Sequence, residues 1–147
     1  MQRRAVSNPA LIGIRTGGLW IAERLRNALA IATEVGELDV SFYRDDFQRA
    51  GMKPHVSPSS LPFEVQDRSI VLVDDVLHTG RTVRAALNEI FDYGRPAAVI
   101  LLALVDRGGR ELPICADVVG SRLELPDGQQ IKLQGPEPLR LSVMTQR

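Results

Sequence analysis

The sequence predicts an α/β domain with a central parallel sheet flanked by helices and an antiparallel hairpin near its C-terminus. Residues 69–73 and 97–105 are apolar runs that read as strands buried on both faces, which is typical of parallel sheets. An amphipathic stretch over 81–93 lies between them, so the three segments form a βαβ unit with parallel strands. Two short alternating runs at the tail, 122–125 and 130–133, flank Asp127-Gly128, a dipeptide that favours a hairpin turn.

The first half of the chain reads as a strand, a turn, a helix and a second strand. Residues 10–14 form a short apolar run, and 15–18 form a tight turn. Apolar residues then recur at helical spacing over 19–29, and Gly36 is a candidate helix terminator. Alternation over 39–44 predicts the second strand.

Residues 45–67 are polar, rich in turn-forming residues and without a sustained period. A loop of this length in a small domain is uncommon and often functional, so we expect a flexible loop, part of which could form a short hairpin.

Composition excludes several classes of protein. The 147 residues fit one domain over 1–147, and the 44% apolar content suffices for a core. No apolar run approaches the roughly 18 residues of a membrane-spanning helix, and no signal-type stretch follows the basic start. We therefore expect a cytoplasmic protein with no membrane partner. The single cysteine, Cys115, excludes a disulfide framework, and the formal net charge is zero.

Polar loops follow three of the predicted strands, at residues 15–18, 74–82 and 106–110. Ligands of open α/β sheets bind beyond the carboxyl ends of the strands, so we expect all three loops on one rim.

The middle loop is the most informative. Asp74 and Asp75 are adjacent carboxylates that can accept hydrogen bonds from a vicinal diol, such as the ribose hydroxyls. Thr79, Gly80 and Thr82 lie where the next helix begins, and its backbone N–H groups, its dipole and two hydroxyls form a phosphate cradle. Gly80 lets the backbone approach an anion without a Cβ in the way. Together these residues predict a site for a ribose 5-phosphate.

Other nucleotide motifs are missing. GxxxxGK[ST] and GxGxxG are absent, which excludes a P-loop ATPase and leaves a dinucleotide-binding fold unsupported. Phospho-receiver domains also carry an Asp pair after a strand, but 73 residues precede Asp74 here and neither lysine follows a buried strand.

Residues 70–82 resemble the phosphoribosyl-pyrophosphate (PRPP) signature of type I phosphoribosyltransferases. The resemblance narrows to the PyrR family, bifunctional pyrimidine-operon regulators with uracil phosphoribosyltransferase activity, over four further segments: 42–46, 83–86, 94–96 and 104–114. It implies the type I phosphoribosyltransferase fold, with 45–67 as a hood over the site. It also implies the reaction of uracil with PRPP to UMP and diphosphate, with Mg²⁺ as cofactor.

The resemblance also implies roles for individual residues. Asp74 and Asp75 would hold the ribose hydroxyls and, indirectly, the metal, and Arg44 would complete the catalytic set by reaching the pyrophosphate. The resemblance also implies that Arg15, Thr16 and Gly17 contact the pyrophosphate, and that Arg107 and Asp106 contact the base. The implied contacts with the 5-phosphate are Val76, Leu77, His78, Thr79, Gly80, Arg81 and Thr82.

The regulatory half of the family binds a leader RNA through basic residues that follow the Asp-Arg-Gly turn. Gly109, Cys115 and Ser121 stand here where the family usually has His, Arg and Lys, whereas Arg110 is retained as the candidate RNA-binding residue. RNA affinity rests on neutralised phosphates, so fewer cations predict weaker binding.

Three interpretations stay open: a uracil phosphoribosyltransferase with or without regulation through pyr leader RNA, a regulator that senses UMP or UTP and binds nucleic acid with little turnover, and a PRPP transferase for another base. In each, the resemblance implies a homodimer or higher homo-oligomer. Only residues 1–9 precede the first predicted strand, where the family usually has about one more helix, so we expect a domain without that helix.

Overall fold

The computed structural model describes residues 8–40 and 59–145. Its elements, in chain order, are β1 (Ala10–Ile14), α1 (Gly17–Leu29), β2 (Gly36–Leu38), β3 (Ser69–Leu77), α3 (Arg81–Tyr93), β4 (Ala98–Asp106), β5 (Val118–Arg122), β6 (Gln129–Gln134) and β7 (Arg140–Thr145).

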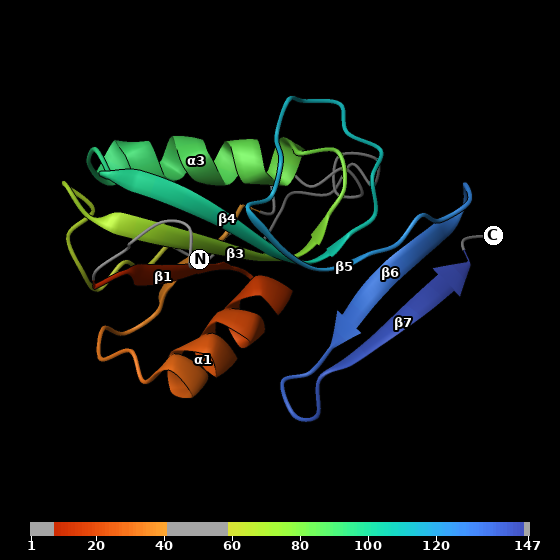
Figure 1. Cartoon of the computed structure of the whole chain (residues 1–147), viewed down its shortest axis with the longest axis horizontal. Helices are drawn as coiled ribbons and strands as arrows, with labels where there is room; N and C mark the ends of the chain where they lie inside the picture. Colours follow the sequence, from red (N-terminus) through yellow and green to blue (C-terminus); the bar gives the residue numbers. More distant parts are fainter. Residues whose placement is uncertain (1–7, 41–58, 146–147) are drawn as a thin grey trace.

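A five-stranded parallel sheet forms the centre of the molecule, with the strand order β2-β1-β3-β4-β5. Helix α3 covers one face of this sheet and helix α1 covers the other (Figure 1). The predicted α/β class and the β3–α3–β4 unit are confirmed, and β3 lies at the centre of the sheet, between β1 and β4.

Alternating side chains of β3 pack into two separate hydrophobic cores, one on each face of the sheet. Ile70 and Leu72 belong to the core on the α3 side, together with Ile90 of that helix. Val71 and Val73 belong to the core on the α1 side. All four side chains of the strand are at most 1% exposed, which explains why its sequence is apolar throughout rather than alternating.

The segment after α1 differs from the prediction. The helix ends at Leu29, with Ala30 in a left-handed conformation as its C-cap, and Gly36 begins β2 instead of terminating the helix. Arg26 holds this end: its Nε donates to the Ile31 carbonyl at 3.2 Å, and its Nη2 donates to the Ala32 carbonyl at 3.2 Å. β2 covers 36–38, so the predicted strand at 39–44 is wrong for residues 39 and 40, and the rest of it lies outside the described residues.

The end of the predicted loop over 45–67 is packed against the sheet. Residues 41–58 lie outside the described part of the chain, but Ser60 forms an antiparallel bridge with Glu37. Val65 is 2% exposed, and Leu61 and Phe63 pack against the same core. Residues 59–67 thus form no helix or strand apart from this bridge, as expected of a loop, but their apolar side chains pack along the edge of the sheet.

The C-terminal hairpin exists, but its turn is not at Asp127-Gly128. β5 runs parallel to β4 in the main sheet, so residue 122 is already paired there and cannot begin a hairpin with β6. Instead β6 pairs with β7 around the turn at 135–139, where Ile131 lies opposite Val143 and Leu133 opposite Leu141. Apolar residues on one face of both strands select this pairing.

The hairpin is attached on the α1 side of the sheet (Figure 1). Leu133 is 7% exposed and enters the core formed by α1, β1 and β3, and Leu139 packs against the same core. Gly135 lies so close to the indole of Trp20 that a Cβ there would come within 2.9 Å of it. An exposed ion pair between Arg24 and Glu137, 2.6 Å long, adds a polar contact.

None of the helices in the described residues is long and apolar enough to cross a membrane.

Replacement of Leu72 by alanine tests the central position of β3. Leu72 is fully buried, and we expect Leu72→Ala to lower the free energy of unfolding by about 2–5 kcal/mol in urea denaturation, because a cavity remains. Leu29→Ala is the matched control, since Leu29 is 54% exposed and its loss should cost less than about 0.5 kcal/mol. Equal losses from both variants would contradict the assignment of the core.

Candidate active site

The order of the strands creates a topological switch point between the ends of β1 and β3. β1 pairs with β3 only as far as Gly13 opposite Val73, whereas β4 pairs with β3 as far as Leu77 opposite Asp106. Chain connections leave β1 and β3 on opposite faces of the sheet, through α1 and α3. A topological switch point of this kind is where open α/β sheets bind ligands.

Asp74 and Asp75 lie in the part of β3 that extends beyond β1. The predicted loop at 74–82 therefore begins late, because the strand continues through both carboxylates to Leu77. Asp74 is 4% exposed and its Oδ1 accepts the Asp75 backbone N–H at 2.9 Å. The Oδ1 of Asp75 in turn accepts the Val76 backbone N–H at 2.8 Å. These hydrogen bonds hold the two carboxylates in place near the carboxyl end of β3.

The loop after β1 meets this acid pair directly. Gly17 is buried, and a Cβ at this position would overlap the carboxyl group of Asp75. Arg15 donates its backbone N–H to the Leu38 carbonyl at 2.9 Å, and Thr16 accepts the Trp20 N–H at 3.3 Å. The helix begins at Gly17, so the predicted turn is shorter than expected and the N-terminus of α1 reaches the rim.

Residues 78–82, here called the phosphate loop, lead into α3, which spans the predicted residues 81–93. Gly80 precedes it with φ +94°, a conformation that favours glycine. Thr79 is 7% exposed, and its hydroxyl accepts the Arg81 N–H at 3.2 Å. Thr82 lies in the first turn of α3, Val76 and Leu77 end β3, and the side chain of His78 is exposed. The N-termini of α1 and α3 thus lie on either side of the acid pair, and both favour anions.

The segment 107–114, here called the clasp, lies against the back of the phosphate loop. The carbonyl of Leu77 accepts the Arg107 N–H at 3.1 Å, and the carbonyl of Thr79 accepts the N–H groups of Glu111 and Leu112 at 2.9 and 3.2 Å. In a trans peptide the C=O and the following N–H point in opposite directions. The clasp therefore turns the N–H groups of the same peptide planes away from itself.

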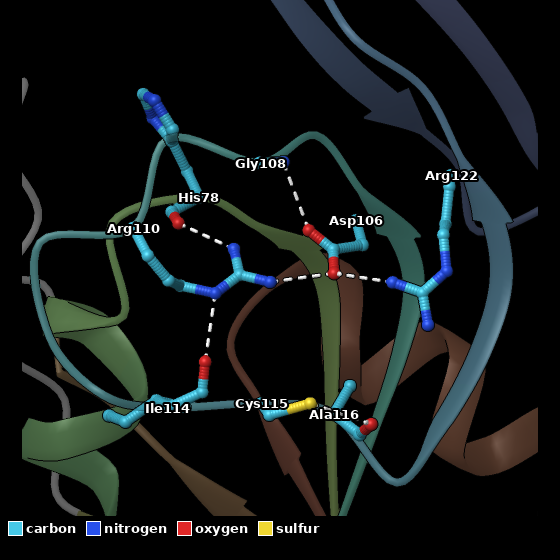
Figure 2. Close-up of polar contacts among 8 residues, drawn as sticks. All are labelled: His78, Asp106, Gly108, Arg110, Ile114, Cys115, Ala116 and Arg122. Atoms are coloured by element: carbon cyan, nitrogen blue, oxygen red, sulfur yellow. Dashed lines mark hydrogen bonds and ion pairs between the residues drawn. The ribbon is translucent and has the colours of Figure 1, made fainter.

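Asp106, the last residue of β4, anchors the clasp (Figure 2). Its Oδ1 accepts the Gly108 N–H at 2.9 Å, and its Oδ2 accepts Nη2 of Arg110 at 2.6 Å and Nη1 of Arg122 at 3.3 Å. The hydrogen bond from Arg110 lowers the pKa of Asp106 below its ordinary value of 3.8, against the opposing effect of burial. A contact of Asp106 with a base stays a prediction, and both of its oxygens already accept hydrogen bonds within the chain.

Arg107 and Arg110 have contrasting surroundings. The Nε of Arg107 is buried and lacks a hydrogen-bond partner within residues 8–40 and 59–145. A ligand at the site could supply that partner, as expected of a base-binding residue. Each of the three guanidinium nitrogens of Arg110 donates a hydrogen bond, and the side chain is only 24% exposed. Arg44, the third predicted catalytic residue, lies outside the described residues.

The donor set fits a metal ion that arrives with its substrate. The described residues contain no group of three or more His, Cys, Asp or Glu side chains that could hold a metal by themselves. Mg²⁺ is commonly bound through one or two carboxylates together with substrate phosphates, and Asp74 and Asp75 supply such a pair.

Comparisons with known proteins agree with this geometry. Residues 3–135 match the family described as "Phosphoribosyl transferase domain". Proteins called "Bifunctional protein PyrR" are similar over 97% of this chain: that of Nitrosococcus oceani is 61% identical and covered over 82% of its length, and that of Pseudomonas syringae pv. tomato is 56% identical and covered over 84%. The chain belongs to the PyrR family.

Solved structures show that this PyrR family member has the fold of the hypoxanthine phosphoribosyltransferases. A Staphylococcus aureus enzyme superposes with a TM-score of 0.60 at 20% identity, over 81% of this chain and 62% of the enzyme. A Trypanosoma cruzi enzyme gives 0.64 at 22% identity, over 84% of this chain and 66% of the enzyme. The chain thus spans slightly less than two thirds of these enzymes. The predicted family and the type I phosphoribosyltransferase fold are confirmed.

The hydrogen bonds of Arg110 within the chain are the feature that sequence reasoning missed in this PyrR family member. The residue was expected to face RNA because it is a basic residue that follows an Asp-Arg-Gly turn. The only signal for another role was the pairing of Asp106 with Arg110 four residues on, and spacing alone does not show that a turn brings the two together.

The lowered pKa of Asp106 gives a pH-dependent contribution to stability. A carboxylate with a lowered pKa stabilises the fold above its ordinary pKa, and this contribution is lost as the pH falls through the folded value. We expect Asp106→Asn to cost about 1–3 kcal/mol at pH 7, because two guanidinium groups lose their charged acceptor. Urea denaturation between pH 7 and pH 3 should show the two proteins converging as acid is added. Asp127→Asn, at an exposed turn, serves as the control, and a constant difference across this range would contradict the assignment.

Proposed function

We propose that this chain transfers the phosphoribosyl group of PRPP to uracil, which forms UMP and releases diphosphate. The observation that carries the proposal is the acid pair Asp74–Asp75 at the switch point, with Gly17 against Asp75 on one side and the phosphate loop on the other. This arrangement suits a sugar whose hydroxyls meet carboxylates, while its two phosphate groups meet the N-termini of two helices.

The reaction needs no nucleophile from the protein. N1 of uracil loses its proton to solvent and bonds to C1 of the ribose, the bond from C1 to the pyrophosphate oxygen breaks, and diphosphate leaves. Positive charge builds up on the sugar in the transition state. Asp74 and Asp75 hold the ribose hydroxyls and place negative charge near the developing cation. Backbone N–H groups at the start of α1 take up the negative charge of the leaving group, and the phosphate loop keeps C1 aligned with the base.

Mg²⁺, held by the diphosphate group and by the acid pair, would neutralise charge on the leaving group. Arg44 would add a bidentate contact to the same group. On the base side we keep Arg107, the residue that directly follows β4, as the candidate contact to the base.

We also propose a location and an oligomeric state for the chain. We place the chain in the cytoplasm as a homodimer or higher homo-oligomer that responds to UMP or UTP. Half-exposed apolar side chains in β7 and just after β5 support self-association: Leu123, Leu141, Val143 and Met144.

Asp75→Asn tests the proposed activity. We expect UMP formation from uracil, PRPP and Mg²⁺ to fall at least about a hundredfold, because the charge beside the ribose is lost while the shape of the side chain stays. Asp92→Asn makes the same chemical change at an exposed position of α3 and should retain full activity. Each variant should unfold at the temperature of the parent. A panel of nucleobases in the same assay separates uracil from purines, and undiminished turnover by Asp75→Asn would defeat the assignment.

A regulatory function is the second candidate, favoured by the name "Bifunctional protein PyrR" that the relatives carry. It would use the UMP-binding site as a sensor and bind a pyrimidine leader RNA. Arg110, the candidate RNA-binding residue, already donates hydrogen bonds to three acceptors within the chain, which supports weak rather than tight RNA binding.

A titration with leader RNA at two salt concentrations, with and without UMP, tests this second function. We expect weak binding that tightens as the salt concentration falls, because phosphate contacts release counterions. The absence of salt-sensitive binding at low salt would exclude the regulatory role.

A further inference from the structure

We propose that Arg110 is a positioning residue that fixes the shape of the phosphate loop from behind and thereby sets the affinity for PRPP. The inference rests on the proposed function, and it gives Arg110 a role in substrate binding that a purely RNA-binding cation would not have.

The guanidinium of Arg110 joins three segments of the chain (Figure 2). Its Nε donates to the Ile114 carbonyl at 2.8 Å, its Nη1 to the His78 carbonyl at 2.7 Å and its Nη2 to Oδ2 of Asp106 at 2.6 Å. These acceptors lie in the clasp, in the phosphate loop and at the end of β4. A planar fork with fixed donor directions holds three acceptors in one relative arrangement, which a flexible ammonium group cannot do.

The hydrogen bond from Arg110 to the His78 carbonyl fixes the peptide plane between His78 and Thr79, which is part of the predicted phosphate site. The carbonyl of His78 and the N–H of Thr79 share one plane and point in opposite directions. Arg110 fixes the carbonyl on the clasp side, so it orients the Thr79 N–H toward the opposite side, where the phosphate cradle is predicted. The carbonyls of Leu77 and Thr79 are held by backbone N–H groups of the clasp, whereas that of His78 accepts from this side chain.

Burial distinguishes Arg110 from Arg81 and Arg122, the two other arginines that form ion pairs in this region. Its side chain is 24% exposed, against 72% for Arg122 and 53% for Arg81. Its acceptor Asp106 is 7% exposed, so the pair is shielded from solvent, and breaking it leaves a buried carboxylate with one guanidinium partner fewer. These contacts occupy three of the five N–H donors of the guanidinium.

A second ion pair between the same two loops provides the control. Arg81 donates to Oε1 of Glu111 at 2.7 Å, but both side chains are 53% exposed. Exposed pairs contribute little, so the loss of the Glu111 carboxylate should leave the phosphate loop in place. Glu111→Gln therefore removes a contact between the clasp and the loop without disturbing the peptide plane of His78.

The test compares Arg110→Gln, Arg110→Lys and Glu111→Gln with the parent protein in two measurements: steady-state UMP formation and calorimetric binding of PRPP with Mg²⁺. We expect Arg110→Gln to raise the KM and the Kd for PRPP roughly tenfold, the scale of one lost charged hydrogen bond, with the KM for uracil changed less than about twofold. Arg110→Lys should keep the charge and the fold but recover only part of the PRPP affinity. Glu111→Gln should match the parent.

Three results would overturn the inference: unchanged PRPP affinity in both Arg110 variants, an equal loss in Glu111→Gln, or RNA affinity reduced by Arg110→Gln while the KM for PRPP stays the same. If Arg110→Gln does not fold, as judged by its melting curve, the comparison of Arg110→Lys with the parent decides. A parent protein that binds PRPP but makes no UMP would defeat the proposed function alone, since the binding measurement still reports on Arg110. A parent that binds no PRPP would defeat both.

Discussion

The unequal pairing of β3 with its two neighbours is the constraint on which the rest of the molecule depends. β1 pairs no further than Val73, while β4 continues to Leu77, so the pairing with β1 ends four residues before the central strand does. The space left by β1 is filled by the start of α1, which places Gly17 against Asp75. Had β1 continued, the carboxylates would lie inside a sheet. The short first strand therefore leaves the two carboxylates beside the N-terminal turn of α1 instead of a further strand.

The position of the clasp, on the other side of the phosphate loop, depends on polar contacts rather than on apolar packing. The clasp contributes few buried side chains, and its position is set by backbone N–H groups on the carbonyls of Leu77 and Thr79 and by the guanidinium of Arg110. Such contacts are directional, so they define the orientation of peptide planes more sharply than hydrophobic contacts do. A loop that must present N–H groups to an anion benefits from this kind of support, because a rotated plane would present a carbonyl oxygen instead.

The sequence predicts those parts of the fold whose pattern comes from burial. The runs at 10–14, 69–73 and 97–105 are apolar because both faces of each strand are covered, and the helix at 81–93 has one apolar face and ends at Gly94. The hairpin was predicted at the wrong turn, because Asp127-Gly128 is a local signal, whereas the pairing of β6 depends on which apolar residues lie opposite one another. The acid pair and the phosphate loop follow from residue types at short spacing. The hydrogen bonds of Arg110 depend on how three segments of the chain meet in the folded protein, which residue spacing alone does not show.

The tryptophan at the start of α1 gives the molecule a built-in optical reporter. Trp20 is the only tryptophan in the chain, so its emission comes from one place. The indole lies between the backbone of Gly135 in the hairpin turn and the first turn of the helix that follows Arg15 and Thr16. Detachment of the hairpin would expose the ring to water and shift its emission to longer wavelength. One fluorophore therefore reports on the attachment of the tail of the chain to the sheet.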